Sequence, residues 1–218
     1  MQPRALATRE ALLVVAARIF ASEGYHAASM RDIAKAADLT QGALYFHFAS
    51  KQALATEIIG RQHRESIDAV TSILESDVSG LGGIVRLSSV LARQIGDSPI
   101  VSAGLRLSTE SVAELASVSS RPYREWVAAS RVLLERASAR GELRDGLDLD
   151  AASELVVSAF SGMQYLTVAL GGTEGLEHRL VRMWPILLGG FARDASHPAV
   201  QDPSEFMKQP SGAKAVSL

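Results

Sequence analysis

The sequence predicts an all-α fold, in which a small three-helix head precedes a larger helical body. Apolar residues recur at intervals of three and four rather than alternating, so helical periodicity dominates and strand signals are nearly absent. Residues suited to helix N-termini precede several of these stretches, and glycines or prolines interrupt the pattern between them. The 218 residues are 47% apolar and 21% charged, a globular composition that can supply a substantial core.

The first two helices of the head are defined by their apolar faces and their ends. The first has an inner face of Leu13, Ala16, Ala17 and Phe20. Gly24 follows it and suits a left-handed C-terminal cap. Ser29 to Asp32 has the Ser-x-x-Asp form of an N-terminal cap. The second helix begins there, and its inner face is Met30, Ile33, Ala34 and Ala37.

The third helix carries more chemistry than its own packing requires. Thr40 can cap a helix that begins at Gln41, in which only Leu44 and Phe48 face the core. A fourth helix starts at Ser50 and turns Leu54 and Ile58 inward. Two short helices joined by about three residues, the second crowded with residues that its core does not need, predict a helix-turn-helix.

The charge distribution agrees with a local polyanion-binding surface. The whole chain has a formal charge of −2, which argues against a polyanion-binding surface along its full length. Residues 1–51 contain six cationic and four acidic side chains, a balance of +2, and the remainder therefore carries −4. If the chain binds nucleic acid, we expect the contact to lie in the head.

The third helix suits the DNA major groove. Gln41 can read adenine, and Gly42 and Ala43 allow a close backbone approach and contact with a thymine methyl. Tyr45 and His47 can donate to phosphates. Cations and hydroxyls beside the helix can hold the strand on either side. The candidate DNA-binding residues are Ser29, Arg31, Thr40, Gln41, Gly42, Ala43, Tyr45, His47 and Lys51. The alternative is a short helix whose aromatics only fill a small core, which we accept for Leu44 and Phe48.

The body is predicted to contain five further helices. They cover residues 81–96, 98–108, 121–140 with Pro122 in the first turn, 150–172 with Asp150 as cap, and 174–193, where Pro185 should kink the chain. From Ser196 onward three prolines and polar residues predict a mobile tail. We expect a DNA-binding domain at 1–51, a ligand-binding and dimerisation domain at 52–195, and the tail at 196–218.

The helix expected at 150–172 contains an uncharged stretch, Leu155 to Gly172, with a polar stripe. Ser158, Ser161, Gln164 and Thr167 recur every three residues along it. These polar residues, and the lack of basic flanking anchors, favour a helix buried in protein over a membrane span. An apolar cavity with a few placed polar groups suits a small neutral signal, although the serines could instead allow close helix packing.

Several functional classes are disfavoured. The chain has no cysteine, and His47, His63, His178 and His197 are not at metal-ligand spacing, so we expect no metal site. The "GDSP" at 96–99 lacks the preceding strand and histidine partner of a hydrolase, and no phosphate loop is present. We therefore expect no enzyme and no cofactor. The N-terminus lacks the apolar region of a signal peptide, so we expect a cytoplasmic protein.

One stretch carries a family resemblance. "FASEGYHAASMRDIAKAADLTQGALYFHFASKQAL", Phe20 to Leu54, resembles the DNA-binding domain of TetR-type repressors. The resemblance implies a three-helix DNA-binding head, a ligand-binding helical body, and a homodimer formed mainly by the last two long helices. Relatives often have lysine where Gln41 stands, which implies that one phosphate contact is replaced by a weaker or base-directed one.

A narrower resemblance covers much of the body. "GALYFHFASK", "AGLRLST", "YREW" and "RMWPILLGGFA" resemble the γ-butyrolactone receptors of actinobacteria. This implies a repressor released from operator DNA by a small diffusible signal, a butyrolactone, butenolide or furan, and control of secondary metabolism. It also implies that Trp126 lies in the signal pocket.

Gln62 is a further candidate that could join pocket to head, although an exposed glutamine is the default. The ligand-binding candidates are Trp126, Gln62, Ser161, Gln164 and Thr167, and Trp184 is expected in the dimer interface. Two alternatives stay open. A drug-sensing repressor of an efflux gene would differ only in the pocket. A helical protein–protein interaction module would grip another protein with the head, and its binding would usually be less sensitive to salt.

Overall fold

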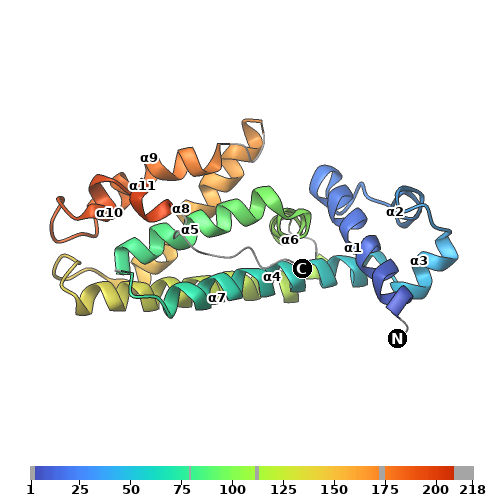
Figure 1. Ribbon diagram of the computed structural model, residues 1–218, viewed down its shortest axis with the longest axis horizontal. Coiled ribbons are helices and arrows are strands. Elements are labelled where there is room, and N and C mark those ends of the chain that lie inside the picture. Colours follow the sequence, from blue (N-terminus) through green and yellow to red (C-terminus); the bar gives the residue numbers. More distant parts are fainter. Residues whose placement is uncertain (1–2, 79, 111–112, 172–174, 209–218) are drawn as a thin grey trace. The chain divides into compact units, whose positions relative to one another are not determined.

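The computed structural model describes residues 3–78, 80–110, 113–171 and 175–208, and it confirms the all-α prediction (Figure 1). Strands are absent from these residues, where an isolated antiparallel bridge joins Leu143 and Ala192. The helices in chain order are α1 (Pro3–Glu23), α2 (Met30–Ala36), α3 (Gln41–His47), α4 (Lys51–Leu74), α5 (Gly80–Asp97), α6 (Pro99–Thr109), η1 (Ala113–Leu115), α7 (Ala116–Ala139), α8 (Leu149–Ala169), α9 (Leu176–Gly189), α10 (Pro198–Gln201) and α11 (Ser204–Met207).

The chain forms two compact units, and each contains two separate segments of the sequence. The first comprises Met1–Asp68 and Gln94–Glu125, and the second Ala69–Arg93 and Trp126–Leu218. Helices α4, α5 and α7 contribute to both. The compact unit that contains α1, α2 and α3 therefore extends beyond α3. It is completed by most of α4 and by α6.

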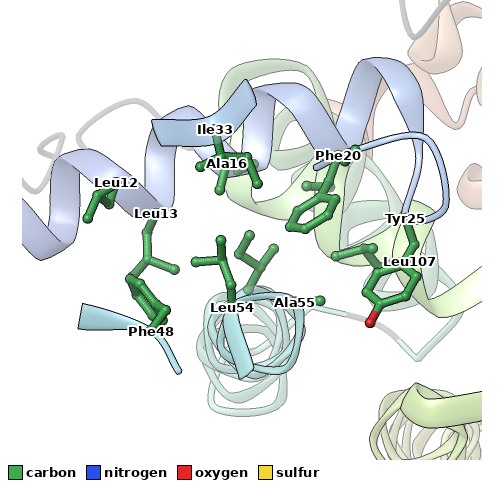
Figure 2. Packing of buried hydrophobic residues seen from close by; sticks show 14 of the residues in the cluster. Leu12, Leu13, Ala16, Phe20, Tyr25, Ile33, Phe48, Leu54, Ala55 and Leu107 are labelled. Carbon is green, nitrogen blue, oxygen red and sulfur yellow. The ribbon is translucent and has the colours of Figure 1, made fainter. Parts of the chain in front are cut away.

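The core of the first unit explains this. Buried side chains from α1, α2, α4 and α6 meet in one cluster (Figure 2), which includes Leu13, Phe20, Ile33, Leu54 and Leu107. The aromatic ring of Tyr25, in the loop after α1, stacks on that of Phe20 with ring centroids 6.1 Å apart. Burying side chains of this size stabilises the unit by roughly 1.5–3 kcal/mol each. Helix α6 is thus part of the core that holds α2 and α3.

Local capping fixes the ends of α2 and α3 as the sequence predicts. The Ser29 hydroxyl accepts from the Asp32 N–H (3.1 Å), and the Thr40 hydroxyl accepts from the Ala43 N–H (3.2 Å). Between the helices, Asp38 has φ 54, in the left-handed region. The N–H groups of Asp38 and Leu39 return to carbonyls of α2, the pattern of a Schellman cap. The turn between α2 and α3 is therefore fixed by backbone hydrogen bonds.

Three expectations about the body are corrected, those at Trp184 and Asp150 in the second unit and that at Pro122 in the first. Trp184, expected in a dimer interface, is fully buried within the second unit, and its indole nitrogen donates to the Ser88 hydroxyl at 2.9 Å. Helix α8 is capped by Asp148 rather than Asp150, because the Asp148 carboxylate accepts from two N–H groups of the first turn. Pro122 lies inside α7, which begins six residues earlier at Ala116. Pro185 lies inside α9, which continues to Gly189.

The expected mobile tail is replaced, through residue 208, by two short helices. Ala199, Val200 and Met207 are buried, so α10 and α11 pack on the unit. The Met207 carbonyl accepts from Arg93 (3.0 Å) and from the Ser89 hydroxyl (3.2 Å). The remainder of the predicted tail, residues 209–218, lies outside the described residues. Within the described ranges, none of the helices combines the length and the apolar character that a membrane crossing needs.

Candidate nucleic-acid interface and signal-binding residues

Helix α3 contributes little to the core and much to the surface. Leu44 is its fully buried residue, and Phe48 at its C-terminal cap is also buried. Gln41 and Gly42 are exposed, Tyr45 is 50% exposed and Phe46 is 82% exposed. A Cβ at Gly42 would meet only the Thr40 hydroxyl, at 4.0 Å, so the fold leaves open space there. The predicted base-reading residues are therefore presented outward on a capped helix.

An open depression of about 770 Å³ lies beside the start of α3. It runs between α2 and α3 and is lined by Arg31, Ala34, Lys35, Asp38, Leu39, Thr40 and Gln41. Arg31 and Lys35 lie four residues apart on α2, and both are exposed. Two cations next to a predicted base-reading side chain suit a DNA backbone that passes along this depression.

Several of the candidate DNA-binding residues have contacts within the head. The Lys51 ammonium donates to the carbonyls of Tyr25 (2.8 Å) and Ala28 (3.0 Å), and it lies 4.4 Å from the centroid of the Tyr25 ring. The Ser29 hydroxyl donates to the Asp32 carboxylate at 2.5 Å. The Lys51 ammonium thus holds the loop between α1 and α2 with two of its three donors, and the expected phosphate contact stays a prediction. His47 is half-buried against Phe46, with the rings edge to face.

A charged network joins α1 to α4. Arg61 pairs with Glu10 and with Glu57, and Arg9 pairs with Glu57 at 3.3 Å. The hydrogen bond from Arg61 holds the pKa of Glu10 below its ordinary value. Burial raises the pKa of Glu57, but hydrogen bonds from Arg9 and Arg61 outweigh burial, so its pKa is lowered as well. The network favours ionised carboxylates and stabilises the first unit.

Gln62 is the ligand-binding candidate that the structure distinguishes most clearly. Its side chain is fully buried, contrary to the exposed default. The amide nitrogen donates to the Ser66 hydroxyl at 2.9 Å, whereas the amide oxygen has no hydrogen-bond partner among the described residues. A buried acceptor without a partner is costly, so this oxygen is suited to a ligand hydroxyl or N–H.

The other candidates differ in exposure. Trp126 is half-buried on α7 with its indole nitrogen shielded from solvent. On α8, Ser161 and Gln164 are half-buried and Ser158 is exposed. Thr167 is buried, and its hydroxyl donates to the Met163 carbonyl at 2.8 Å. These four polar residues, spaced by three along α8, therefore pass from the exposed to the buried face of the helix. Gln62 belongs to the first unit and these residues to the second, so a shared pocket stays a prediction.

Helices α8 and α9, which pack on each other, expose several large apolar side chains. Leu155, Leu166 and Val168 of α8 are between 43% and 54% exposed, and Ile186 of α9 is 83% exposed. An open groove of about 630 Å³ between the two helices is lined mainly by apolar residues and by Arg179 and Arg182. Exposed apolar surface of this kind marks an interaction site.

Comparison with known proteins places the chain in a family. The model of bacterial regulatory proteins of the tetR family matches residues 12–58. That of the tetracyclin repressor-like C-terminal domain matches residues 78–192, more than half of the chain. The chain belongs to the TetR family. The first match contains α2, α3 and the start of α4, so the exposed α3 lies within the part of the chain that the tetR-family model covers.

Three similar proteins refine the comparison. The A-factor receptor protein of Streptomyces griseus is 32% identical over 199 residues, which are 91% of this TetR-family chain and 67% of that protein. A crystal structure of a gamma-butyrolactone receptor (ArpA-like protein) has a TM-score of 0.79 at 28% identity, over 94% of this chain and 98% of that one. CprB from Streptomyces coelicolor, in complex with its biological operator sequence, has a TM-score of 0.79 at 27% identity, over 95% and 100%.

Sequence reasoning missed two surface residues of this TetR-family head. Lys35 lines the depression with Arg31, and Phe46 is the most exposed aromatic of α3 among the described residues. The spacing of Arg31 and Lys35, four apart on one helix, places them on the same face and could have identified Lys35. No comparable sequence signal separates Phe46 from Phe48, because both lie in the same short aromatic run.

Proposed function

We propose that the chain is a ligand-responsive transcriptional repressor that binds a pseudo-palindromic operator as a homodimer. A small diffusible signal of the γ-butyrolactone, butenolide or furan type releases it, and its targets belong to secondary metabolism. The DNA-binding part of the proposal rests on the exposure of α3. Leu44 of this helix is buried in the core, whereas Gln41, Gly42 and Tyr45 are exposed. The similarity to the A-factor receptor protein and to a gamma-butyrolactone receptor supports the signal class.

The homodimer is supported by the apolar surface of α8 and α9. Exposure of side chains such as Leu155 and Ile186 to water is unfavourable, and covering them against a second copy of the same surface removes that cost. A two-fold dimer presents two recognition helices to successive major grooves, roughly 34 Å apart. The operator is then expected to be pseudo-palindromic.

Release follows from a population shift. The signal favours a state in which the two heads are too far apart or too tilted to reach successive major grooves. By linkage, the operator must weaken signal binding by the same factor. Gln62 is the candidate signal contact on the side of the head, since its buried amide oxygen has no partner among the described residues. Trp126, Ser161, Gln164 and Thr167 are the candidates on the side of the second unit.

Fluorescence anisotropy with a labelled duplex from the protein's own promoter tests the DNA-binding part. We expect tight, saturable binding that weakens roughly tenfold or more between low and moderate salt, because phosphate contacts release counterions. Binding to a protein partner with little salt dependence, and none to the duplex, would favour an interaction module instead. A drug-sensing repressor would bind the duplex and release it only with cationic drugs.

A further inference from the structure

The loop that follows α1 is held from helix α6. The Tyr25 N–H donates to the Glu110 carboxylate at 2.6 Å, and the same carboxylate accepts from Arg106 Nε at 2.8 Å. Arg106 Nη1 donates to the Ala21 carbonyl at 2.7 Å, near the C-terminus of α1. We name these two side chains, with the two backbone groups that they hold, the α6 bracket. The bracket joins residues 85 positions apart in sequence.

The chain is shaped to accept this contact. Gly24 has φ +85, which L side chains rarely adopt. A Cβ there would lie 2.2 Å from Glu110 Oε1 and 3.0 Å from Arg106 Nη2. Glycine at this position therefore serves both the left-handed backbone and the close approach of Glu110. A helix end that only needed a cap would leave this space open.

Helix α6 carries both the bracket and a contact to the candidate signal residue Gln62. Earlier on the same helix, Gly104 packs on Gln62, and a Cβ at Gly104 would lie 2.4 Å from the Gln62 Cβ. On the other side of the bracketed loop, Lys51 holds the Tyr25 and Ala28 carbonyls just before α2 begins. All these residues belong to the first unit. Helix α6 thus contacts Gln62 at one position and the loop that carries α2 at another.

We propose that Arg106 and Glu110 are positioning residues for operator binding, and that the orientation of α2 and α3 follows α6 through the α6 bracket. The proposal rests on the proposed function, since it assumes that α3 binds an operator. A shift of α6 moves the Glu110 carboxylate and with it the Tyr25 N–H, and the bonds from Lys51 carry the shift to the start of α2. Packing of α6 in the head core, through Leu107, makes the helix and the loop move together.

The experiment compares Glu110→Ala, Glu110→Gln and the control Glu135→Ala. Glu135 forms an i,i+4 ion pair with Arg131 at 3.1 Å on α7 and has no part in the bracket. Hydrogen exchange of the Tyr25 amide and anisotropy with the promoter duplex are measured on the full-length protein without signal. Glu110→Ala is expected to speed exchange and to weaken operator binding, each about tenfold, because a charged acceptor is lost. Glu110→Gln, whose amide oxygen can still accept from Tyr25, is expected to recover most of the affinity.

A double-variant cycle separates a specific contact from general destabilisation. Gly24→Ala is expected to weaken operator binding less in the Glu110→Ala background than in the wild type, because the 2.2 Å clash is removed and only the backbone strain remains. Equal effects in both backgrounds, or operator affinity in Glu110→Ala within twofold of Glu135→Ala, would overturn the proposal. If the wild type binds no duplex, the proposed function fails, while Tyr25 exchange in Glu110→Ala unchanged from the control would refute the bracket itself.

Discussion

The Gln62 side chain lies directly against the backbone of Gly104, so that a methyl group added at 104 would lie 2.4 Å from its Cβ and 2.8 Å from its Cγ. This contact between α4 and α6 explains how a glutamine can be fully buried in the middle of a long helix. It also ties a candidate signal-binding residue to the helix that packs into the head core. The identity of residue 104 should therefore affect both stability and response.

Gly104→Ala is expected to destabilise the protein by about 1–3 kcal/mol, the usual cost of overpacking, and to weaken release by the signal. The matched control is Gly96→Ala on α5, where an added Cβ meets nothing within 4 Å. That control should be neutral or slightly stabilising, because alanine favours helix over glycine. Urea unfolding followed by circular dichroism measures both, and equal stabilities would show that Gln62 moves aside without cost.

Gln62→Met is expected to separate stability from response. The substitution loses the hydrogen bond to Ser66 but also removes a buried acceptor that has no partner among the described residues. Because these effects oppose each other, the free energy of unfolding should change by less than about 1 kcal/mol. Operator binding should be retained, while release by the signal should be strongly reduced. A variant that still responds at the wild-type signal concentration would remove Gln62 from the signal site.

Gly42→Val should abolish specific operator binding and leave the fold intact. A Cβ at this position has open space in the free protein, but it would meet the duplex in the major groove. Circular dichroism and size-exclusion chromatography check the fold and the dimer, and anisotropy measures binding. If operator affinity were retained, α3 would not be the helix in the major groove. The control is Gly96→Val, at an exposed position of α5.

Arg31 and Lys51 should respond differently to salt. Arg31 is exposed in the depression beside α3, so Arg31→Gln is expected to reduce the slope of log affinity against log salt by about 1. Lys51 donates to two head carbonyls, so Lys51→Gln should weaken binding with the slope unchanged. A reduced slope for Lys51→Gln would support the phosphate contact expected from sequence.

Acid should weaken the first unit through Glu10 and Glu57. Both have a pKa below the ordinary value of 4.5, so their stabilising contribution is complete above that value and is lost as pH falls through the lowered values. Hydrogen exchange of α1 and α4 amides between pH 6 and 3 follows this loss. Arg61→Gln should make it shallower, and Arg193→Gln, which breaks an exposed pair with Asp145, should not.

Local sequence patterns were sufficient to predict the helices of the head and their caps, but not the long-range contacts that hold these helices in place. The caps at Ser29 and Thr40 and the inward Leu44 and Phe48 follow from spacing within a few residues, and the structure confirms them. Lys51 could not be placed in this way, because its partners lie 26 and 23 residues earlier.

The same limit applies to the second unit. Trp184 was expected in the dimer interface because the sequence around it does not indicate which residue it contacts. Its hydrogen-bond partner, the Ser88 hydroxyl, lies 96 residues away in the sequence. The last short helix, α11, is held through its Met207 carbonyl by Arg93 and Ser89, more than 100 residues earlier, so local composition could not predict it. The polar stripe of α8 was predicted from the sequence. Which of its residues are exposed and which are buried depends on how α8 packs on the other helices, which the spacing alone does not show.

In the proposed function, binding of a small signal to the protein weakens its binding to the operator. The most direct measurement is the anisotropy of the labelled promoter duplex, saturated with protein and titrated with a panel of butyrolactones, butenolides, furans and cationic drugs. We expect a lactone-like compound to release the duplex from the wild type and not from Gln62→Met. Release by cationic drugs alone, or by none of the compounds, would contradict the signal-receptor function.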